Sequence, residues 1–208
     1  ANFCQGPAMT EQQCKQAILV GRDNVLSDID NTQLYIAGEM GIGNTSTASA
    51  LASALLKCDP LDVVGPGTGL DQHGIQHKVT VIQRALELHQ SELNDDPLST
   101  LTLLGGFEIA AMVGAYLTCA RQGIPVLIDG FISTVAALTA ERMQPGCKDW
   151  FIYSHQSAEP GHKVVLNALD AKPLLQLDMR LGEGSGAAVA VPLLRQACLL
   201  HNGMATFE

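Results

Sequence analysis

Basic residues are scarce in this sequence. Its 208 residues include 12 lysines and arginines against 21 aspartates and glutamates, which gives a net charge of -9 at pH 7. Surfaces that bind nucleic acid are rich in Lys and Arg, because contacts with the phosphate backbone supply much of the affinity. The composition therefore argues against a nucleic-acid partner.

Long apolar runs are missing as well. No run reaches the roughly 18 apolar residues that indicate a transmembrane helix, and the first residues do not read as a signal peptide. We therefore predict no membrane partner and a cytoplasmic location. The chain starts at Ala1 rather than at a methionine and stops at Glu208 within sequence that reads as ordered, so we expect a fragment of a longer protein.

Clustered metal ligands and paired cysteines are also missing. The sequence has no CxxC pair, and its six cysteines are scattered over Cys4, Cys14, Cys58, Cys119, Cys147 and Cys198. This spacing is typical of reduced thiols rather than of a disulfide framework. His73 and His77 stand four residues apart without a third ligand at a telling spacing, and no third ligand accompanies His155 and His162 either. We therefore predict exposed or structural histidines and no metal site.

The composition that remains is that of a globular protein. Hydrophobic residues make up 47% of the chain and charged residues 16%, which excludes an intrinsically disordered protein. A chain of this length can bury a substantial core within one large domain. We predict a single domain over residues 1–208 with a nucleotide-binding core.

The stretch from Gly38 to Thr47 organises the sequence. A short apolar run precedes it and helix-forming residues follow it. Glycines at such a strand-to-helix turn let a ligand approach the backbone, and a helix start capped by Asn44, Thr45 or Ser46 favours an anion such as phosphate. The stretch lacks the third glycine of a dinucleotide fingerprint and the Lys-Ser/Thr pair of a P-loop. The pattern alone fits both a nucleotide site and a tight turn before a capped helix.

The unit of apolar run, glycine or acidic turn, and helix recurs about six times along the chain. The expected strands are 33–37, 61–64, 101–104, 125–128, 150–153 and 174–179. The expected helices are 11–23, 45–57, 74–93, 107–121, 132–142, 160–169 and 187–201. Such alternation predicts parallel strands joined by right-handed helical crossovers. We therefore predict an α/β fold, with a mostly parallel Rossmann-like sheet flanked by helices and a ligand cleft at the carboxyl ends of the strands.

Four charged residues near these turns are candidates for chemistry. Glu39 and Glu183 stand among glycines, where a carboxylate is hard to explain as core. A partly desolvated glutamate has a raised pKa and can accept a proton near neutral pH, whereas a helix cap is the structural alternative. Lys78 could neutralise a phosphate or be a solvated helix lysine. Asp129 ends a strand and could bind sugar hydroxyls or form the turn.

Several motifs follow one another along the chain: GEMGIGNT at 38–45, PGTG at 66–69, LGGFEIA at 104–110, LIDGF at 127–131, SHQSAE at 154–159 and RLGEGSG at 180–186. Together they resemble the nicotinate-nucleotide–dimethylbenzimidazole phosphoribosyltransferase family. The resemblance covers essentially all 208 residues. Because several motifs occur in the same order, it is far more specific than any single motif.

The resemblance implies a reaction and a set of site residues. The reaction transfers ribose phosphate from nicotinate mononucleotide to 5,6-dimethylbenzimidazole in cobalamin biosynthesis, giving α-ribazole 5'-phosphate and nicotinate with inversion at the anomeric carbon. Glu183 matches the catalytic carboxylate that takes the proton of the attacking benzimidazole. The implied nucleotide-side residues are Glu39, Gly41, Lys78 (near the phosphate), Gly105, Gly106, Asp129, Gly130 and Ser157. The resemblance implies no metal or redox cofactor, and it implies a homodimer.

The resemblance also defines the alternatives. Family members carry further segments before the equivalent of Ala1 and after that of Glu208, which build a smaller domain and much of the benzimidazole pocket. Some relatives use adenine or phenolic acceptors, and some act as heteromers. A non-catalytic nucleotide-binding subunit and a transferase with another acceptor are therefore the competing interpretations. A nicotinamide-cofactor dehydrogenase is disfavoured by the incomplete fingerprint.

Overall fold

The computed structural model of the chain describes residues 1–67 and 69–205. Thr68 of the PGTG motif and residues 206–208 lie outside the described residues. The helices are α1 (Glu11–Leu26), α2 (Asn44–Leu56), α3 (Pro60–Val63), α4 (Gln72–Leu88), α5 (Pro97–Leu104), α6 (Phe107–Gln122), α7 (Phe131–Met143), α8 (Pro160–Ala168) and α9 (Ser185–Gly203). The strands are β1 (Val126–Ile128), β2 (Phe151–Tyr153), β3 (His155–Gln156) and β4 (Leu175–Gln176). No helix in this described part of the chain is long and apolar enough to cross a bilayer.

The predicted helices are confirmed, and two of their ends follow the expected chemistry. A capping box starts α1: Thr10 Oγ1 accepts the Gln13 N–H at 3.2 Å, and the Gln13 side chain accepts the Thr10 N–H at 2.9 Å. Gly123 ends α6 in the left-handed conformation, at φ 71°. Glycine is common at this position because it has no Cβ to clash there.

The predicted strands at 61–64 and 101–104 are wrong, because α3 and α5 occupy these residues. Each helix begins at an Asp-Pro pair. Asp59 accepts the backbone N–H two residues ahead at 2.8 Å, and Asp96 accepts two backbone N–H groups at 3.1 Å. Proline suits the first helical position, where its missing N–H needs no partner. The Asp-Pro pairs therefore start helices, and the apolar runs that follow them are buried helix faces.

The strands form a narrow parallel ribbon of two two-stranded sheets rather than a full Rossmann-like sheet. β1 pairs with β2, and β3 pairs with β4, both in parallel. The segment 33–37, predicted as a strand, makes a single parallel bridge between Tyr35 and Val126. The ribbon is small because two of the six predicted strands are helices and the others pair over three residues or fewer. The fold is thus mixed α/β and mostly helical. Its four parallel extended segments are 33–37, β1, β2 together with β3, and β4.

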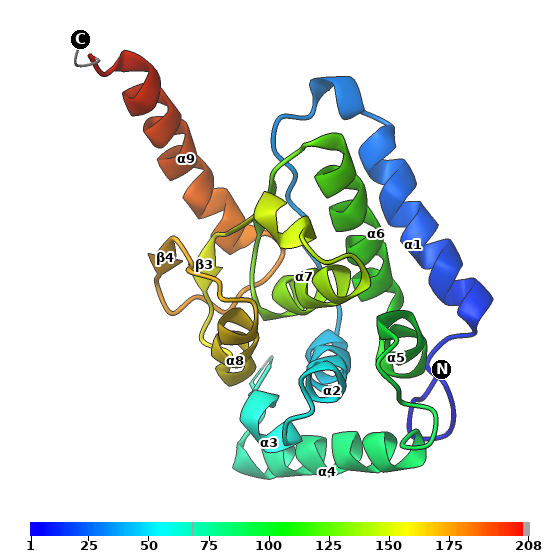
Figure 1. Cartoon of the computed structure of the whole chain (residues 1–208). Coiled ribbons are helices and arrows are strands. Elements are labelled where there is room, and N and C mark those ends of the chain that lie inside the picture. Colours follow the sequence, from blue (N-terminus) through cyan, green and yellow to red (C-terminus); the bar gives the residue numbers. More distant parts are fainter. Residues whose placement is uncertain (68, 206–208) are drawn as a thin grey trace.

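Helices surround this ribbon and supply most of the core. α7 packs on α6, and α1 lies along the other side of α6 (Figure 1). The α1–α6 contact is a backbone contact: a Cβ on Gly21 would overlap the carbonyl oxygen of Ala111, and a Cβ on Gly114 would overlap that of Ile18. Two glycines therefore set the distance between these helices.

The last helix leaves the body of the molecule. α9 starts beside β3 and then extends away from the other helices toward the C-terminal end (Figure 1). Its first turns bury Ala187 and Ala190, whereas Leu193 and Leu199 farther along are exposed. Only the start of α9 is therefore held by the core.

Candidate functional site

A pocket of about 260 Å³ opens where the four extended segments end. The turns that follow all four segments contribute to its lining, together with Gly67 of the turn after α3. The carboxyl ends of parallel strands share one rim, which is why turns so distant in sequence meet here. The predicted position of the cleft is confirmed.

Most of the predicted site residues meet in this pocket. Those that line it are Glu39, Gly41, Asp129, Gly130, Ser157 and Glu183. Lys78 lies behind the wall formed by Thr45 and Gly67. Gly105 and Gly106 stand between α5 and α6, outside the lining, and Gly106 is the N-cap of α6. The structure thus brings six of the nine residues together, puts one directly behind them, and leaves the glycine pair apart.

The turn before α2 differs from the sequence prediction. The N-cap of α2 is Gly43, in the left-handed conformation at φ 97°, so the predicted cap by Asn44, Thr45 or Ser46 is wrong. Asn44 Nδ2 instead donates a hydrogen bond to Glu39 Oε2 at 2.6 Å. Since no side chain caps α2, its first N–H groups keep the donor capacity that suits an anion.

Lys78 is a buried lysine rather than a solvated one. Its side chain is 6% exposed. Its Nζ donates to Thr45 Oγ1 at 2.9 Å and to the Gly65 carbonyl at 3.4 Å. Burial lowers the pKa of the ammonium, and the neighbouring carboxylate of Glu159 opposes this shift. A cation that reaches the pocket wall beside the start of α2 therefore favours an anionic ligand group there.

Backbone contacts bring Glu39 and Glu183 to the same rim. The Glu183 N–H donates to the Glu39 carbonyl at 3.2 Å. A Cβ on Gly38 would lie 2.7 Å from the Glu183 carbonyl carbon, so only glycine lets the two segments approach this closely. Glu183 itself has φ 59° and stands between the left-handed glycines Gly182 and Gly184. This loop geometry directs a carboxylate to the pocket immediately before α9.

The two carboxylates differ in their surroundings. Glu39 is half-buried, and its pKa is raised chiefly by loss of solvation; its Asn44 hydrogen bond opposes the shift, and the charges of Glu108, Asp129 and Glu183 add to it. Glu183 is exposed, so the partial desolvation that we expected for it is found at Glu39 instead. The surroundings of Glu39 therefore disfavour its charged form.

We expect Glu39→Gln to flatten the dependence of stability on pH. The folded-state pKa of Glu39 lies above its ordinary value, so the folded protein binds more protons than the unfolded chain in that window and loses stability as the pH rises through it. The amide cannot ionise, so the melting temperatures of variant and wild type should agree near about pH 4 and the variant should become the more stable toward pH 8. The measurement is thermal unfolding across this range. Exposed Glu87→Gln is the control, and a difference that shrinks as the pH rises would contradict the prediction.

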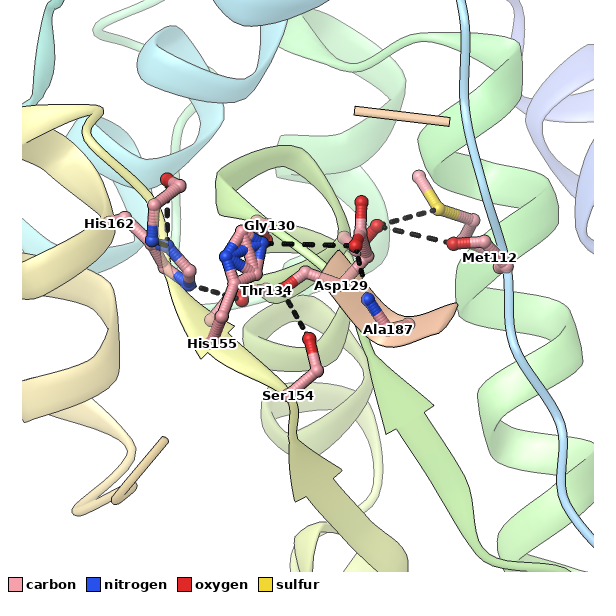
Figure 2. A network of polar contacts seen from close by, with 11 residues as sticks. Met112, Asp129, Gly130, Thr134, Ser154, His155, His162 and Ala187 are labelled. Carbon is pink, nitrogen blue, oxygen red and sulfur yellow. Dashed lines mark hydrogen bonds and ion pairs between the residues drawn. The ribbon is translucent and has the colours of Figure 1, made fainter. Parts of the chain in front are cut away.

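Asp129 connects three elements of the site (Figure 2). Its side chain is 4% exposed and stands at the end of β1. Its Oδ1 accepts the Ala187 N–H in the first turn of α9 at 2.8 Å and lies 3.8 Å from His155 Nε2. A carboxylate in the first turn of a helix stabilises the helix dipole. Asp129 is therefore an anchor for α9, beyond the turn-forming role that its sequence context suggested.

Several residues of the pocket had no predicted role. Arg180 and Glu159 line the pocket from the ends of the last two extended segments, and His155 stands beside Asp129. Met40, Ile42 and Leu181 are exposed apolar side chains in the same lining, with exposed fractions of 81%, 98% and 72%. All of them lie within the motifs quoted above, and their position in the turns after the extended segments was the signal that could have identified them as pocket residues.

Among the described residues, no group of three or more His, Cys, Asp and Glu could hold a metal ion.

The fold and the pocket define an α/β protein with a ligand site at the carboxyl ends of parallel strands. The chain belongs to the phosphoribosyltransferase family DBI_PRT, whose family model matches residues 1–208.

Individual relatives support this assignment. A nicotinate-nucleotide–dimethylbenzimidazole phosphoribosyltransferase of Pseudomonas fluorescens (strain SBW25) is 61% identical over 208 residues, and one of Xanthomonas axonopodis pv. citri (strain 306) is 59% identical. Each match covers 100% of this chain and 59% of the relative. The crystal structure of CobT from Thermus thermophilus superposes with a TM-score of 0.92 at 45% identity, covering 100% of this chain and 62% of that one. The chain thus spans about 59% of the length of the curated relatives that it matches.

Proposed function

We propose that this protein transfers the phosphoribosyl group of nicotinate mononucleotide to 5,6-dimethylbenzimidazole, giving α-ribazole 5'-phosphate and nicotinate. The observation that carries the proposal is the convergence of Glu39, Asp129, Ser157 and Glu183 in one pocket. They come from separate stretches of a chain that is 61% identical to a protein named for this reaction.

In the proposed reaction, a ring nitrogen of the benzimidazole attacks C1' of the ribose. The bond from C1' to the nicotinate nitrogen breaks, and its electron pair stays on nicotinate, whose ring nitrogen becomes neutral. The attacking ring loses its N–H proton to the carboxylate of Glu183. Such a base contributes about 10²–10⁴-fold to the rate, and the orientation of the two rings about C1' contributes further.

The pocket offers a separate environment to each part of the nucleotide. Lys78 and the uncapped start of α2 lie on one side and suit the phosphate. Exposed Met40, Ile42 and Leu181 offer apolar surface to flat aromatic rings. Glu39, Gly41, Asp129, Gly130 and Ser157 line the same pocket and are proposed to contact the nucleotide. Gly105 and Gly106 are proposed as more distant supports.

Two further properties belong to this proposal. A cytoplasmic location is supported by six free cysteines, three of them buried, because such thiols persist in a reducing compartment. A homodimer is supported by the exposed apolar side chains along α9, which are costly to leave in water. Light scattering of the purified protein tests the second of these.

Calorimetry tests the proposed function on the 208-residue chain. Nicotinate mononucleotide is titrated first, because Lys78 and the carboxylates of the nucleotide side all lie within the chain. We expect saturable binding of the nucleotide, and weak or no binding of dimethylbenzimidazole that is added afterwards. Inorganic phosphate should compete with the nucleotide. A chain with full helical circular dichroism that does not bind nicotinate mononucleotide would show the proposal to be wrong.

A further inference from the structure

His162 stands outside the pocket lining, yet its side chain contacts one loop that forms the pocket and the start of α7 (Figure 2). It lies on α8 and is fully buried. Its Nδ1 is 2.9 Å from both the backbone nitrogen and the Oγ of Ser157. Its Nε2 is 2.9 Å from Thr134 Oγ1 on α7. One imidazole therefore connects the loop after β3 to the start of α7.

The hydrogen bonds around the ring fix the position of its proton. A backbone N–H can only donate, so the bond from Ser157 makes Nδ1 an acceptor without a proton. Thr134 Oγ1 donates to the Gly130 carbonyl at 2.8 Å, so it accepts from Nε2, which carries the proton. The donors then run in one direction, from His162 Nε2–H to Thr134 O–H to the Gly130 carbonyl. With Nδ1 unprotonated, the Ser157 hydroxyl also donates to the ring.

This arrangement requires a neutral ring. A second proton on the imidazole would face the Ser157 N–H, which is itself a donor. Burial lowers the pKa of His162 to about 3, and the neighbouring His155 adds to the shift. The ring is also 0% exposed, so solvent does not compete for its three hydrogen bonds. His162 thus has one tautomer and one orientation over the physiological range.

We propose that His162 is a positioning residue that holds the Ser157 loop and the Gly130 loop at the distance required for nucleotide binding. Its contact with Ser157 fixes one wall of the pocket, and its contact through Thr134 fixes the other. Its link to nucleotide binding rests on the function proposed above, which assigns Gly130 and Ser157 to the nucleotide side. The inference that His162 positions the two loops rests only on its hydrogen bonds with Ser157 and Thr134.

The test compares His162→Leu with two other variants. Leucine has nearly the volume of histidine but forms none of the three hydrogen bonds, whereas His162→Asn keeps an acceptor for the Ser157 N–H. Leu166→Ala is the matched control, because Leu166 lies on the same helix and is 2% exposed, so its truncation destabilises the protein without removing these bonds. Two quantities are measured in each folded variant: the affinity for nicotinate mononucleotide, and the amide exchange rate of Ser157 relative to that of the core residue Val135.

We expect His162→Leu to weaken nucleotide binding by about tenfold or more, and to speed the relative exchange of Ser157 by a similar factor. His162→Asn should restore part of both, and Leu166→Ala should change neither. A folded His162→Leu protein with wild-type relative exchange at Ser157 overturns the positioning, whatever its affinity. Faster exchange with unchanged affinity overturns the link to binding. A wild-type chain that binds no nucleotide refutes the proposed function and this link together, while the exchange measurement still decides the positioning.

Discussion

Glu183→Gln is expected to reduce phosphoribosyl transfer by about 10²–10⁴-fold, the usual contribution of a positioned general base. The amide has the shape of the carboxylate but cannot take the proton of the attacking benzimidazole. The loop geometry should survive, because the left-handed glycines on both sides and the Glu183 N–H bond to the Glu39 carbonyl do not involve the side chain. The measurement is nicotinate release at saturating nucleotide and a large excess of dimethylbenzimidazole, because the chain is expected to bind this acceptor weakly. The dissociation constant of nicotinate mononucleotide is measured by calorimetry.

The affinity for the nucleotide separates a lost base from a damaged pocket. We expect the dissociation constant to stay within about threefold of wild type, so that the loss falls on kcat. Glu159→Gln provides a comparison, because Glu159 lines the same pocket next to Lys78, on the side proposed for the phosphate. If Glu183→Gln retains near-wild-type turnover, another group takes the proton, and the proposal that Glu183 is the general base is wrong. If turnover and nucleotide binding disappear together, the residue supports the pocket rather than the chemistry.

Gly114→Ala is expected to cause one of the largest losses of stability among single-methyl additions in the helices, together with Gly21→Ala. The added Cβ would overlap the Ile18 carbonyl oxygen, and a backbone atom cannot move aside as a side chain does. Alanine favours a helix over glycine by about 1 kcal/mol, but overpacking costs about 1–3 kcal/mol and occasionally more. Because the overlap is with backbone, we expect a net loss of about 2 kcal/mol, or roughly 4–8 °C in Tm for a chain of this size.

A control glycine distinguishes the contact from the general effect of the substitution. Gly203 is also helical, and nothing lies within 4 Å of the place where its Cβ would stand. Gly203→Ala should leave Tm unchanged or slightly raised. Gly21→Ala should behave like Gly114→Ala, because its Cβ would overlap the Ala111 carbonyl oxygen. Equal Tm values for Gly114→Ala and Gly203→Ala in thermal unfolding would show that the α1–α6 distance adjusts at little cost.

Local sequence signals were sufficient for the seven predicted helices and for the rim of the pocket. The capping box at Thr10 and the glycine at position 123 depend on neighbouring residues alone, so a pattern can find them. The carboxylates Glu39 and Glu183 were placed on one rim because turns after parallel strands meet there. The acceptor of the proposed reaction could not be predicted from local patterns, because dimethylbenzimidazole was inferred from the family resemblance alone.

The errors arose where a local pattern allows two structures. A short apolar run fits a buried strand or a buried helix face, and at 61–64 and 101–104 the Asp-Pro pair upstream decided for a helix. Long-range contacts were beyond any pattern. Asp129 caps a helix 58 residues away, and His162 bonds to Thr134 across 28 residues. Only folding brings such partners together, so their roles could not be read from spacing.

The anchoring of α9 has a mechanical consequence. Glu183 lies directly before the first turn of this helix, and Asp129 holds that turn through Ala187. The rest of α9 projects outward (Figure 1), so a tilt of the projecting part of the helix also moves its first turn and the neighbouring Glu183. We expect a partner that packs on Leu193 and Leu199 and tilts α9 to shift the carboxylate of Glu183 in this way. By thermodynamic reciprocity, a ligand that fixes Glu183 then changes the affinity for that partner. We therefore expect a partner that binds α9 to be coupled to the proposed chemistry through the contact of Asp129 with Ala187.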